Sequence, residues 1–387
     1  MTIPKDKINV MHLVLSLETG GLERIVADSV LAIDDRLFNA EVCCLDRLGC
    51  FAETLIEDGK CVTLLQRNQS RYDYLFPLKL RKFLIEKQVH VLHIHSGTFF
   101  LATQAGVLAR TPAMIYTDHG RPLVETKIDV LMDRFSGCFV DKIVAVSNEL
   151  EDYLVNEIKL PKRKTTTLIN GINTSKYCFR EKSQVLMQEF DITSKDQVIG
   201  TVGRLAEVKD QISLIEAFSL VQEKLPNSVL MLVGDGPMKE KINNKITELN
   251  LGDRVRITGN RNDVPLLLNL MDVFVLSSLS EGTSVALLEA MSSGIAPIVT
   301  NVGGNPSLVD DKVNGMLTSP KNIDELSGKL IYLLQNEDER KEYGEKASQK
   351  VRNKYSIAKM VKEYEMLYLG TLDKKQKCSI LVATGSS

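Results

Sequence analysis

The chain has 387 residues, of which 44% are hydrophobic and 25% are charged, and its formal net charge is −2. These proportions exclude a disordered chain, a collagen-like repeat and a small domain stapled by disulfides. Because no basic field accompanies this charge, we expect no nucleic-acid partner.

The cysteines and the apolar runs indicate the compartment. The seven cysteines are an odd number, and no pair has Cys-x-x-Cys spacing, so neither a zinc site nor a disulfide framework is indicated. No apolar run reaches the roughly 18 residues of a membrane span, and the short run near the N-terminus is expected to be a first strand. We expect a cytoplasmic protein with no bound metal.

Short β-branched apolar runs alternate with helical patterns through the first half of the chain. The run Ile143-Val144-Ala145-Val146 is apolar on both faces, as a parallel strand covered by helices requires. We expect strands at 8–16, 40–45, 61–65, 89–95, 113–117, 142–146 and 165–169, with helices at 22–33, 75–88, 98–110 and 148–158. This alternation predicts stacked βαβ units in a doubly wound sheet.

The alternation stops at residues 172–196, which are polar and charged, and then starts again. We expect strands at 197–202, 228–233, 254–258, 272–276 and 296–300, and helices at 210–224, 238–249, 284–293 and over most of 322–370. The prediction is an α/β chain with domains at 1–175 and 196–355, followed at 356–387 by a helix and a tail that is frayed from 373. Ligands of such sheets bind beyond the carboxyl ends of the strands, so the cleft between two domains is the expected active site.

The densest group of candidate residues is the segment from Glu281 to Gly294, which follows the apolar run 273–276. A small polar loop there opens a helix, and a helix N-terminus suits an anion such as a diphosphate. Glu281 lies in the loop and Glu289 lies within the helix, where both can accept hydrogen bonds from sugar or ribose hydroxyls. A solvated helix glutamate is the simpler interpretation, but Glu289 is surrounded by apolar residues, where an unpartnered carboxylate is costly.

Two further loops follow strands of the second domain. Gly203 permits a tight turn before Arg204 and Lys209, an Arg that can bind phosphate through two hydrogen bonds and a Lys that supplies a point charge. Solvated surface cations are the alternative interpretation. The loop around Gly234 has the residues of a tight turn after a strand, and it can line a nucleotide pocket. Neither loop has the P-loop pattern.

The first domain offers two candidate sites of its own. Gly20 and Gly21 follow the first strand and allow close backbone approach to a ligand at the next helix, although the segment is not Gly-x-Gly-x-x-Gly. His119 follows the fifth strand, where a lone histidine is more often structural than catalytic. His93 and His95 resemble a metal pair without a third ligand, so we interpret them as structural or as lining the cleft.

Together these motifs resemble the retaining family-4 glycosyltransferases of the GT-B fold, over nearly the whole chain. Glu281 and Glu289 match the two ends of the Glu-x7-Glu element of that family. The matching stretches are TGGLE at 19–23, DHG at 118–120, VSNEL at 146–150, NGIN at 170–173, GTVGRLAEVKD at 200–210, LVGDGP at 232–237, SEGTSVALLEAMSSG at 280–294 and VGGNPSLVDD at 302–311.

The resemblance implies two Rossmann-like domains facing across a cleft, with the C-terminal helix crossing back to the N-terminal domain, which binds the acceptor. Arg204 and Lys209 would hold the diphosphate of a nucleotide-sugar, Glu281 the transferred sugar and Glu289 the ribose. His119 would lie near the sugar. The other donor-binding residues implied are Gly21, Gly203, Gly234, Thr283, Ser284, Val285 and Leu288.

The implied reaction is transfer of a hexose or N-acetylhexosamine to a glycan or lipid-linked acceptor in cell-surface polysaccharide synthesis, in a bacterium. Retention without a metal or other cofactor is expected, and UDP is the expected nucleotide. Ser284 and Ser307 depart from the proline and glutamate of many relatives, which bears on the donor sugar. The alternatives are a nucleotide-sugar epimerase of the same fold or a non-catalytic nucleotide-sugar-binding subunit.

Residues 67–88 interleave basic and aromatic side chains. Such a segment can lie on an anionic membrane and meet a lipid-linked acceptor at the inner face. A core helix with a solvated basic face fits the same periodicity equally well.

Overall fold

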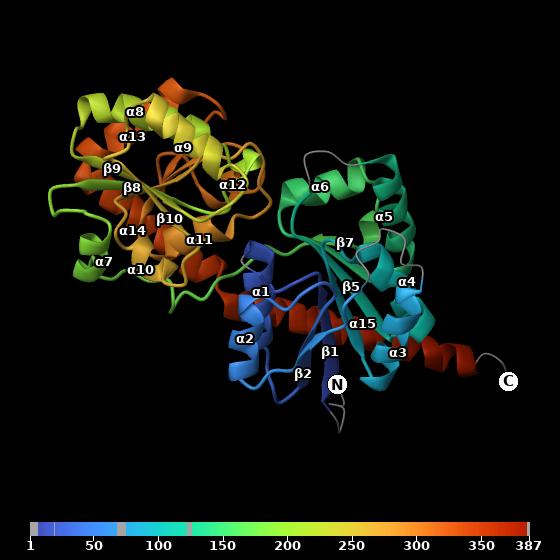
Figure 1. Ribbon diagram of the computed structural model, residues 1–387. Coiled ribbons are helices and arrows are strands. Elements are labelled where there is room, and N and C mark those ends of the chain that lie inside the picture. The colour runs from blue at the N-terminus through green and yellow to red at the C-terminus, as the bar shows by residue number, and fades with distance from the viewer. Residues whose placement is uncertain (1–6, 19, 68–74, 122–125, 385–387) are drawn as a thin grey trace. The chain divides into compact units, whose positions relative to one another are not determined.

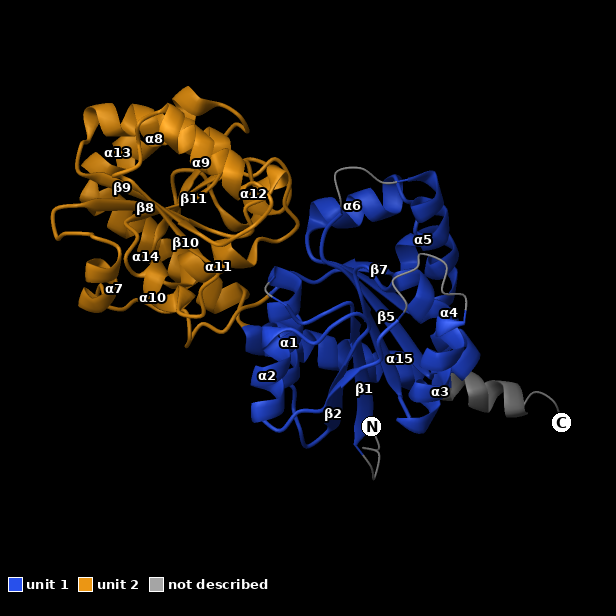
Figure 2. Cartoon of the chain, viewed as in Figure 1, with its two compact units in different colours: residues 1–170, 357–387 blue, residues 171–356 orange. Residues whose placement is uncertain are grey.

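The computed structural model describes residues 7–18, 20–67, 75–121 and 126–384, with side chains to residue 375. The chain divides into two compact units (Figure 2). Unit 1 comprises residues 1–170 and 357–387, and unit 2 comprises residues 171–356.

Unit 1 is built on a seven-stranded parallel sheet with the strand order β3-β2-β1-β4-β5-β6-β7 (Figure 1). Its strands are β1 (Ile8–Val14), β2 (Phe38–Cys44), β3 (Val62–Leu64), β4 (Val91–His95), β5 (Ala113–Asp118), β6 (Lys142–Ala145) and β7 (Thr165–Thr167). Its helices are α1 (Gly21–Ala32), α2 (Cys50–Glu57), α3 (Phe76–Glu86), α4 (Phe99–Ala109), α5 (Lys127–Phe139), α6 (Asn148–Asn156) and α15 (Ile357–Thr384). The strand order reverses beside β1, which is where α/β sheets place ligands.

Side chains alternate between the two faces of this sheet. Leu92 and Ile94 of β4 join a buried apolar cluster that also contains residues of α3 and α4. His93 and His95 alternate with them and therefore lie on the opposite face. The central strands are buried on both sides, as the apolar run at 143–146 predicts.

Helix α15 comes from the far end of the chain and packs against α1 and β5. It buries Tyr364 and Tyr368, which are 5% and 1% exposed. This confirms that the C-terminal helix crosses back to the N-terminal sheet. The predicted frayed tail from 373 is wrong, because the helix continues to Thr384.

Unit 2 contains a six-stranded parallel sheet with the order β10-β9-β8-β11-β12-β13. Its strands are β8 (Gln197–Val202), β9 (Ser228–Val233), β10 (Val255–Gly259), β11 (Val273–Leu276), β12 (Ala296–Thr300) and β13 (Met316–Thr318). Its helices are α7 (Gln184–Glu189), α8 (Gln211–Lys224), α9 (Lys239–Glu248), α10 (Val264–Leu268), α11 (Val285–Ser292), α12 (Asn305–Leu308), α13 (Ile323–Gln335) and α14 (Glu337–Lys354).

Unit 2 starts at Gly171, earlier than the predicted domain start at 196. The polar segment 172–196 is not a free linker, because Tyr177 is 1% exposed and its carbonyl accepts a hydrogen bond from Ser292 Oγ at 2.5 Å. The Ile172 N–H donates to the Tyr355 carbonyl at 2.9 Å, so the first and last segments of unit 2 run side by side. Because the buried Tyr177 has polar neighbours in the sequence, the composition of the segment does not indicate that it packs on unit 2.

The sequence patterns did not indicate α2, α5, α10, α12 and β13, of which α5 is the longest at 13 residues. Helices α10 and α12 begin with a proline in their first turn, and each has five residues or fewer, too few to show a helical period. Among the described residues, no helix is both long and apolar enough to cross a bilayer.

Candidate active site

The loop after β8 carries Arg204 on a backbone that only glycines permit. Gly203 has φ +156°, and a Cβ on Gly234, which has φ +137°, would lie 2.1 Å from the Gly203 carbonyl oxygen. The Leu205 N–H donates to the Asp235 carbonyl at 3.0 Å, which ties the two loops together. The predicted Gly234 motif therefore supports the Arg204 loop, and Arg204 itself is exposed.

Lys209 ends a short 3-10 turn at Glu207–Lys209, just before α8. Asp210 adopts a left-handed conformation and caps α8 by bonding to Ser213. Ser277 Oγ, which follows β11, donates to the Lys209 and Asp210 carbonyls at 3.0 and 2.9 Å. The backbone beside Lys209 is thus fixed against the exit of the neighbouring strand.

Glu281 lies directly opposite Lys209. Its Oε1 accepts from Lys209 Nζ at 2.7 Å and from Ser278 Oγ at 2.6 Å. Only 7% of the Glu281 side chain is exposed, against 27% for Lys209. The structure brings together the two predicted motifs at the carboxyl edge of this sheet, where β8 and β11 are neighbours.

The Glu281 backbone is held by Gly303 and Gly304 of the VGGNP segment. Gly303 has φ +54°, and a Cβ there would lie 1.8 Å from the Glu281 carbonyl oxygen. The Gly304 N–H donates to the Gly282 carbonyl at 3.0 Å. The VGGNP segment therefore positions the Glu281 loop.

Helix α11 begins where sequence analysis placed it. Ser284 is its N-cap, and its hydroxyl accepts from the Leu287 N–H at 3.3 Å, which a proline at this position could not do. Glu289 is on this helix and is only 4% exposed, so the solvated-glutamate interpretation is wrong. Ser307 Oγ donates to the Gly304 carbonyl at 2.7 Å, a local bond.

The other predicted donor-binding residues of this segment are buried as well. Thr283 and Val285 are buried beside the helix start, at 7% and 9% exposure. Leu288 is fully buried, and its N–H donates to the Ser284 carbonyl at 3.2 Å. Its side chain belongs to the core, so a contact of Leu288 with the donor would have to use the backbone, and this assignment stays a prediction.

In unit 1, Gly21 is the first residue of α1 and is exposed. Gly20 is the N-cap, with extended backbone at φ −178°. Thr19 of the same motif lies outside the described residues. The helix N-terminus therefore presents N–H groups at the carboxyl edge of β1, as an anion requires.

His119 follows β5 in a turn that buried charges hold. Arg121 Nε lies 2.7 Å from Asp118 Oδ2, and Arg121 Nη1 lies 2.5 Å from Asp133 Oδ2. Tyr116 donates to Asp118 Oδ2 at 2.9 Å. The His119 N–H donates to Ser96 Oγ at 2.8 Å. Both the backbone and the flanking charges fix His119 at the sheet edge.

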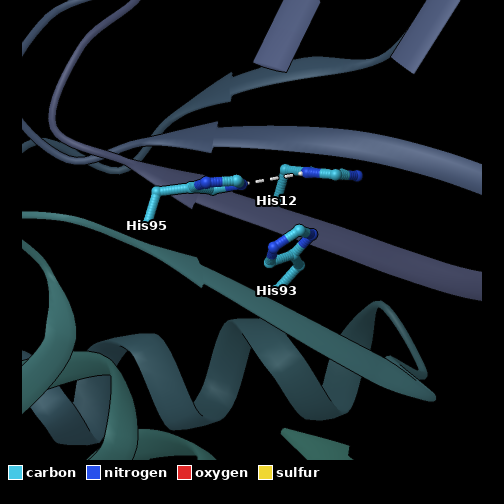
Figure 3. Close-up of side chains that lie close together, drawn as sticks. All are labelled: His12, His93 and His95. Carbon is cyan, nitrogen blue, oxygen red and sulfur yellow. Dashed lines mark hydrogen bonds between the residues drawn. The ribbon is translucent and has the colours of Figure 1, made fainter. Parts of the chain in front are cut away.

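The His119 ring continues into a buried group of imidazoles. His95 Nδ1 lies 2.9 Å from His119 Nε2, and His95 Nε2 lies 3.1 Å from His12 Nδ1. Figure 3 shows His12 and His95 joined in this way, with His93 to one side. Burial lowers the pKa of His12 to about 4 and that of His119 to about 3, so both are neutral at pH 7.

His12 was missed by sequence analysis, and it supplies the third histidine that His93 and His95 lacked. Ligand nitrogens of the three lie within 4.8 Å of one another, a grouping that could hold a metal ion. However, His93 bonds through both nitrogens, to Tyr368 Oη at 2.7 Å and to Thr117 Oγ1 at 2.8 Å. The two-residue spacing of His93 and His95 was the available signal that they share a face, and β1 pairing aligns His12 with His93.

Two family models match this chain. The model described as Glycosyltransferase Family 4 matches residues 19–176, and the model described as Glycosyl transferases group 1 matches residues 182–350. The chain belongs to the family-4 glycosyltransferases. The two matches cover both units and include Lys209, Glu281 and His119.

Curated relatives of this glycosyltransferase are similar over most of its length. A UDP-Gal:α-D-GlcNAc-diphosphoundecaprenol α-1,3-galactosyltransferase of Escherichia coli is 27% identical over 384 residues, which covers 96% of this chain and 99% of that protein. The N-acetyl-α-D-glucosaminyl L-malate synthase of Bacillus anthracis is 27% identical over 316 residues, which covers 79% and 82%. The name of the first relative gives a diphosphoundecaprenol-linked sugar as its acceptor, and that of the second names L-malate.

Solved structures confirm the GT-B fold of this glycosyltransferase. The crystal structure of Anabaena Alr3699/HepE in complex with UDP and glucose has a TM-score of 0.82 at 21% identity, and it covers 93% of this chain and 99% of that chain. WaaG, a glycosyltransferase involved in lipopolysaccharide biosynthesis, has a TM-score of 0.73 at 16% identity, with 93% and 100% covered. At these identities the likeness shows the fold alone.

Proposed function

We propose that this glycosyltransferase transfers a hexose or N-acetylhexosamine from a UDP-sugar to a lipid-linked sugar in cell-surface polysaccharide synthesis. The observation that carries the proposal is the Lys209–Glu281 pair at 2.7 Å. It places a cation and a carboxylate side by side at the carboxyl edge of a Rossmann-like sheet, beside the N-terminus of α11. The names of the E. coli relative and of the HepE complex support UDP as the nucleotide.

Each donor group has a candidate partner in the two units. Exposed Arg204 and half-buried Lys209 would bind the diphosphate, where their charge favours departure of UDP. Glu281 would accept hydrogen bonds from the transferred sugar, and buried Glu289 from the ribose. Gly21 would approach the phosphates, and His119 would contact the sugar.

The proposed step breaks the bond from the anomeric carbon to the diphosphate oxygen and forms a bond from that carbon to an acceptor oxygen. The acceptor hydroxyl proton moves to the departing diphosphate on the same face, so that the anomeric configuration is retained. Positioning and electrostatic stabilisation supply the rate enhancement. Arg204 and Lys209 provide the positive charge, so we propose a metal-independent reaction.

The acceptor side is proposed to meet an anionic membrane through α3, α4 and α5. Of residues 67–88, the segment 68–74 lies outside the described residues, but α3 exposes Leu78 and Ile85 at 52% and 48%. Helix α5 adds an exposed apolar stripe at three- and four-residue spacing. Its members are Ile128, Leu131, Phe135 and Phe139, at 60%, 65%, 51% and 42% exposure.

Basic side chains are exposed on the same two helices. Lys79, Arg81 and Lys82 are exposed on α3, and Lys127 and Arg134 are exposed on α5. Arg81 Nε donates to the Leu108 carbonyl at 3.1 Å, which joins α3 to α4. Exposed apolar residues together with exposed cations are suited to an anionic lipid surface, where a lipid-linked acceptor would be located.

The deciding experiment is a donor and product screen. The full chain would be incubated with UDP-galactose, UDP-glucose, UDP-N-acetylglucosamine and UDP-N-acetylgalactosamine, each with a synthetic N-acetylglucosamine-diphospho-lipid. We expect transfer from one of them, with an α-linked product by NMR and no loss of rate with EDTA. Absence of transfer with all four, or an epimerised sugar from donor alone, would reject the proposal; a β-linked product would reject retention.

A further inference from the structure

Three imidazoles from three neighbouring strands form a continuous hydrogen-bonded row in unit 1. His12 lies on β1, His95 ends β4 and His119 directly follows β5. The row runs from His12 Nδ1 to His95 Nε2 at 3.1 Å and from His95 Nδ1 to His119 Nε2 at 2.9 Å. Both nitrogens of the central ring are therefore used.

Counting protons restricts this row to two arrangements. A neutral imidazole carries one N–H and one acceptor nitrogen. Burial is the main cause that lowers the pKa of His95, as it is for His12 and His119. If His95 donates through Nε2, all three rings carry their proton on Nε2. If His95 donates through Nδ1, all three carry it on Nδ1.

The outer nitrogen of His119 distinguishes the two arrangements. Its Nδ1 is buried and has no hydrogen-bond partner among the described residues. An unpaired buried N–H is rarer in proteins than an unpaired acceptor. The arrangement with a proton on every Nε2 leaves a lone pair at His119 Nδ1, and the other arrangement would leave an unpaired N–H there.

We propose that His95 and His12 are positioning residues that hold His119 as the Nε2–H tautomer, so that its Nδ1 accepts a hydrogen bond from a hydroxyl of the transferred sugar. The sugar part rests on the proposed function. His119 Nδ1 is buried in the structure, so the bond requires that the atoms covering it be displaced when the sugar binds. A hydroxyl of the sugar would donate to His119 Nδ1, the one acceptor nitrogen of the row without a partner among the described residues.

His93 provides a matched control within the same cluster. It packs 4.2 Å from the His95 ring centre, but its nitrogens bond to Tyr368 and Thr117 instead of to the row. Replacing His93 therefore removes an equally buried imidazole and leaves the row unbroken. These hydrogen bonds also oppose metal binding by His12, His93 and His95, because a metal ion would have to displace the His12–His95 bond.

The tautomers can be measured without substrate. The chain contains five histidines, so long-range ¹H–¹⁵N spectra of the full chain with ¹⁵N-labelled histidine are simple enough to assign by single substitutions. We expect His12, His95 and His119 as Nε2–H tautomers at pH 7.5, and His95→Phe should release His119 into a tautomer mixture. A proton on His119 Nδ1, a mixture in the unsubstituted protein, or a stoichiometric metal ion in the purified protein would overturn the proposal.

The second measurement separates positioning from structure. With whichever UDP-sugar the donor screen finds active, His95→Phe should lower kcat/KM about tenfold or more, as expected for one misaligned hydrogen bond. The Kd of UDP, which lacks the sugar, should not change, and His95→Asn should recover part of the rate. An equal loss in His93→Phe, or weaker UDP binding in His95→Phe, would overturn the proposal. If no donor is active, the proposed function fails while the tautomer spectra still decide the row.

Discussion

Lys209 and Glu281 form an ion pair at 2.7 Å although 72 positions separate them in the chain. Each is held by its own backbone support: Ser277 bonds to the Lys209 carbonyl, and Gly303 packs on the Glu281 carbonyl. A pair fixed in this way is preorganised, so little reorganisation is needed when charge develops on a leaving diphosphate.

Removal of either member of this pair should abolish sugar transfer while the fold persists. We expect Lys209→Ala and Glu281→Ala each to lower kcat by about a hundredfold or more, because a positioned charge is lost. Steady-state kinetics and circular dichroism would measure this. Lys239→Ala is the matched control, since Lys239 forms an exposed pair with Asp235 at 3.0 Å. Near-normal turnover in both site variants would contradict the assignment.

Gly303→Ala should damage the same site through the backbone. Its φ of +54° and the 1.8 Å approach to the Glu281 carbonyl oxygen leave no room for a Cβ, so the loop must move. We expect unfolding to become easier by more than about 1 kcal/mol, with loss of transfer. Gly328→Ala is the control: it lies within α13 and has nothing within 4 Å of its added Cβ, so it should raise Tm slightly. Equal behaviour of the two variants in thermal melts would count against this account.

Tyr368→Phe should weaken the attachment of α15 to the sheet. The Tyr368 hydroxyl bonds to His93 Nδ1 at 2.7 Å and is buried, so its removal leaves the imidazole without that partner. We expect a loss of about 1–2 kcal/mol in urea unfolding. Met366, 58% exposed on the same helix, supplies the control Met366→Ala, which should change stability little. A neutral Tyr368→Phe would show that the hydrogen bond does not contribute.

Stability should fall as pH drops from 7 to 5.5. The folded-state pKa of His12 is lowered to about 4 and that of His93 lies well below its usual value, mainly through burial. The unfolded chain therefore binds protons near pH 6.5 that the folded chain does not bind. Each histidine lowers the free energy of unfolding by up to about 1.4 kcal/mol per pH unit below that value. The loss is complete only below the folded pKa values.

Urea denaturation at pH 7.5 and 5.5 would measure this dependence. The variant His93→Gln should show a smaller loss on acidification, because one buried imidazole is gone. Among the described residues, the other titratable rings that contact His93 or follow it in the imidazole group are His95, His119, Tyr364 and Tyr368. Unfolding free energies that do not change between the two pH values would refute the assignment of neutral buried histidines.

Phe135→Glu combined with Leu131→Glu should abolish binding to vesicles that contain phosphatidylglycerol. The substitutions place two anions in the exposed α5 stripe, where both burial in lipid and attraction to anionic headgroups are lost. Co-sedimentation would show it, and binding of the unsubstituted chain should weaken with salt. Phe179→Glu is the control, since Phe179 is 75% exposed in unit 2. Absence of binding by the unsubstituted chain would refute the membrane surface.

The local patterns of the chain were enough to predict every sheet strand of the described residues except β13, the restart of the alternation and the loops that carry Arg204, Lys209 and Glu281. They succeed because each strand is a short apolar run and each motif follows one directly, and both signals depend only on neighbours in sequence. Glu289 was also placed correctly on a buried helix, since apolar residues flank it.

Other features needed contacts between distant segments. The attachment of 172–196 to unit 2 depends on Tyr177 meeting Ser292, and no local pattern records that bond. The packing of α15 on the first sheet depends on Tyr364 and Tyr368 meeting Thr117 and His93.

Lys209 and Glu281 illustrate both what the sequence predicts and what only contacts between distant segments decide. Sequence alone identified both residues and the edge of the sheet on which they lie, because parallel strands end together. Only the tertiary structure decided that they pair, that Gly303 holds one of them, and that His12 completes the row behind His119. Those arrangements arise from strand order and side-chain packing, which bring together residues that carry no signal of one another in the chain.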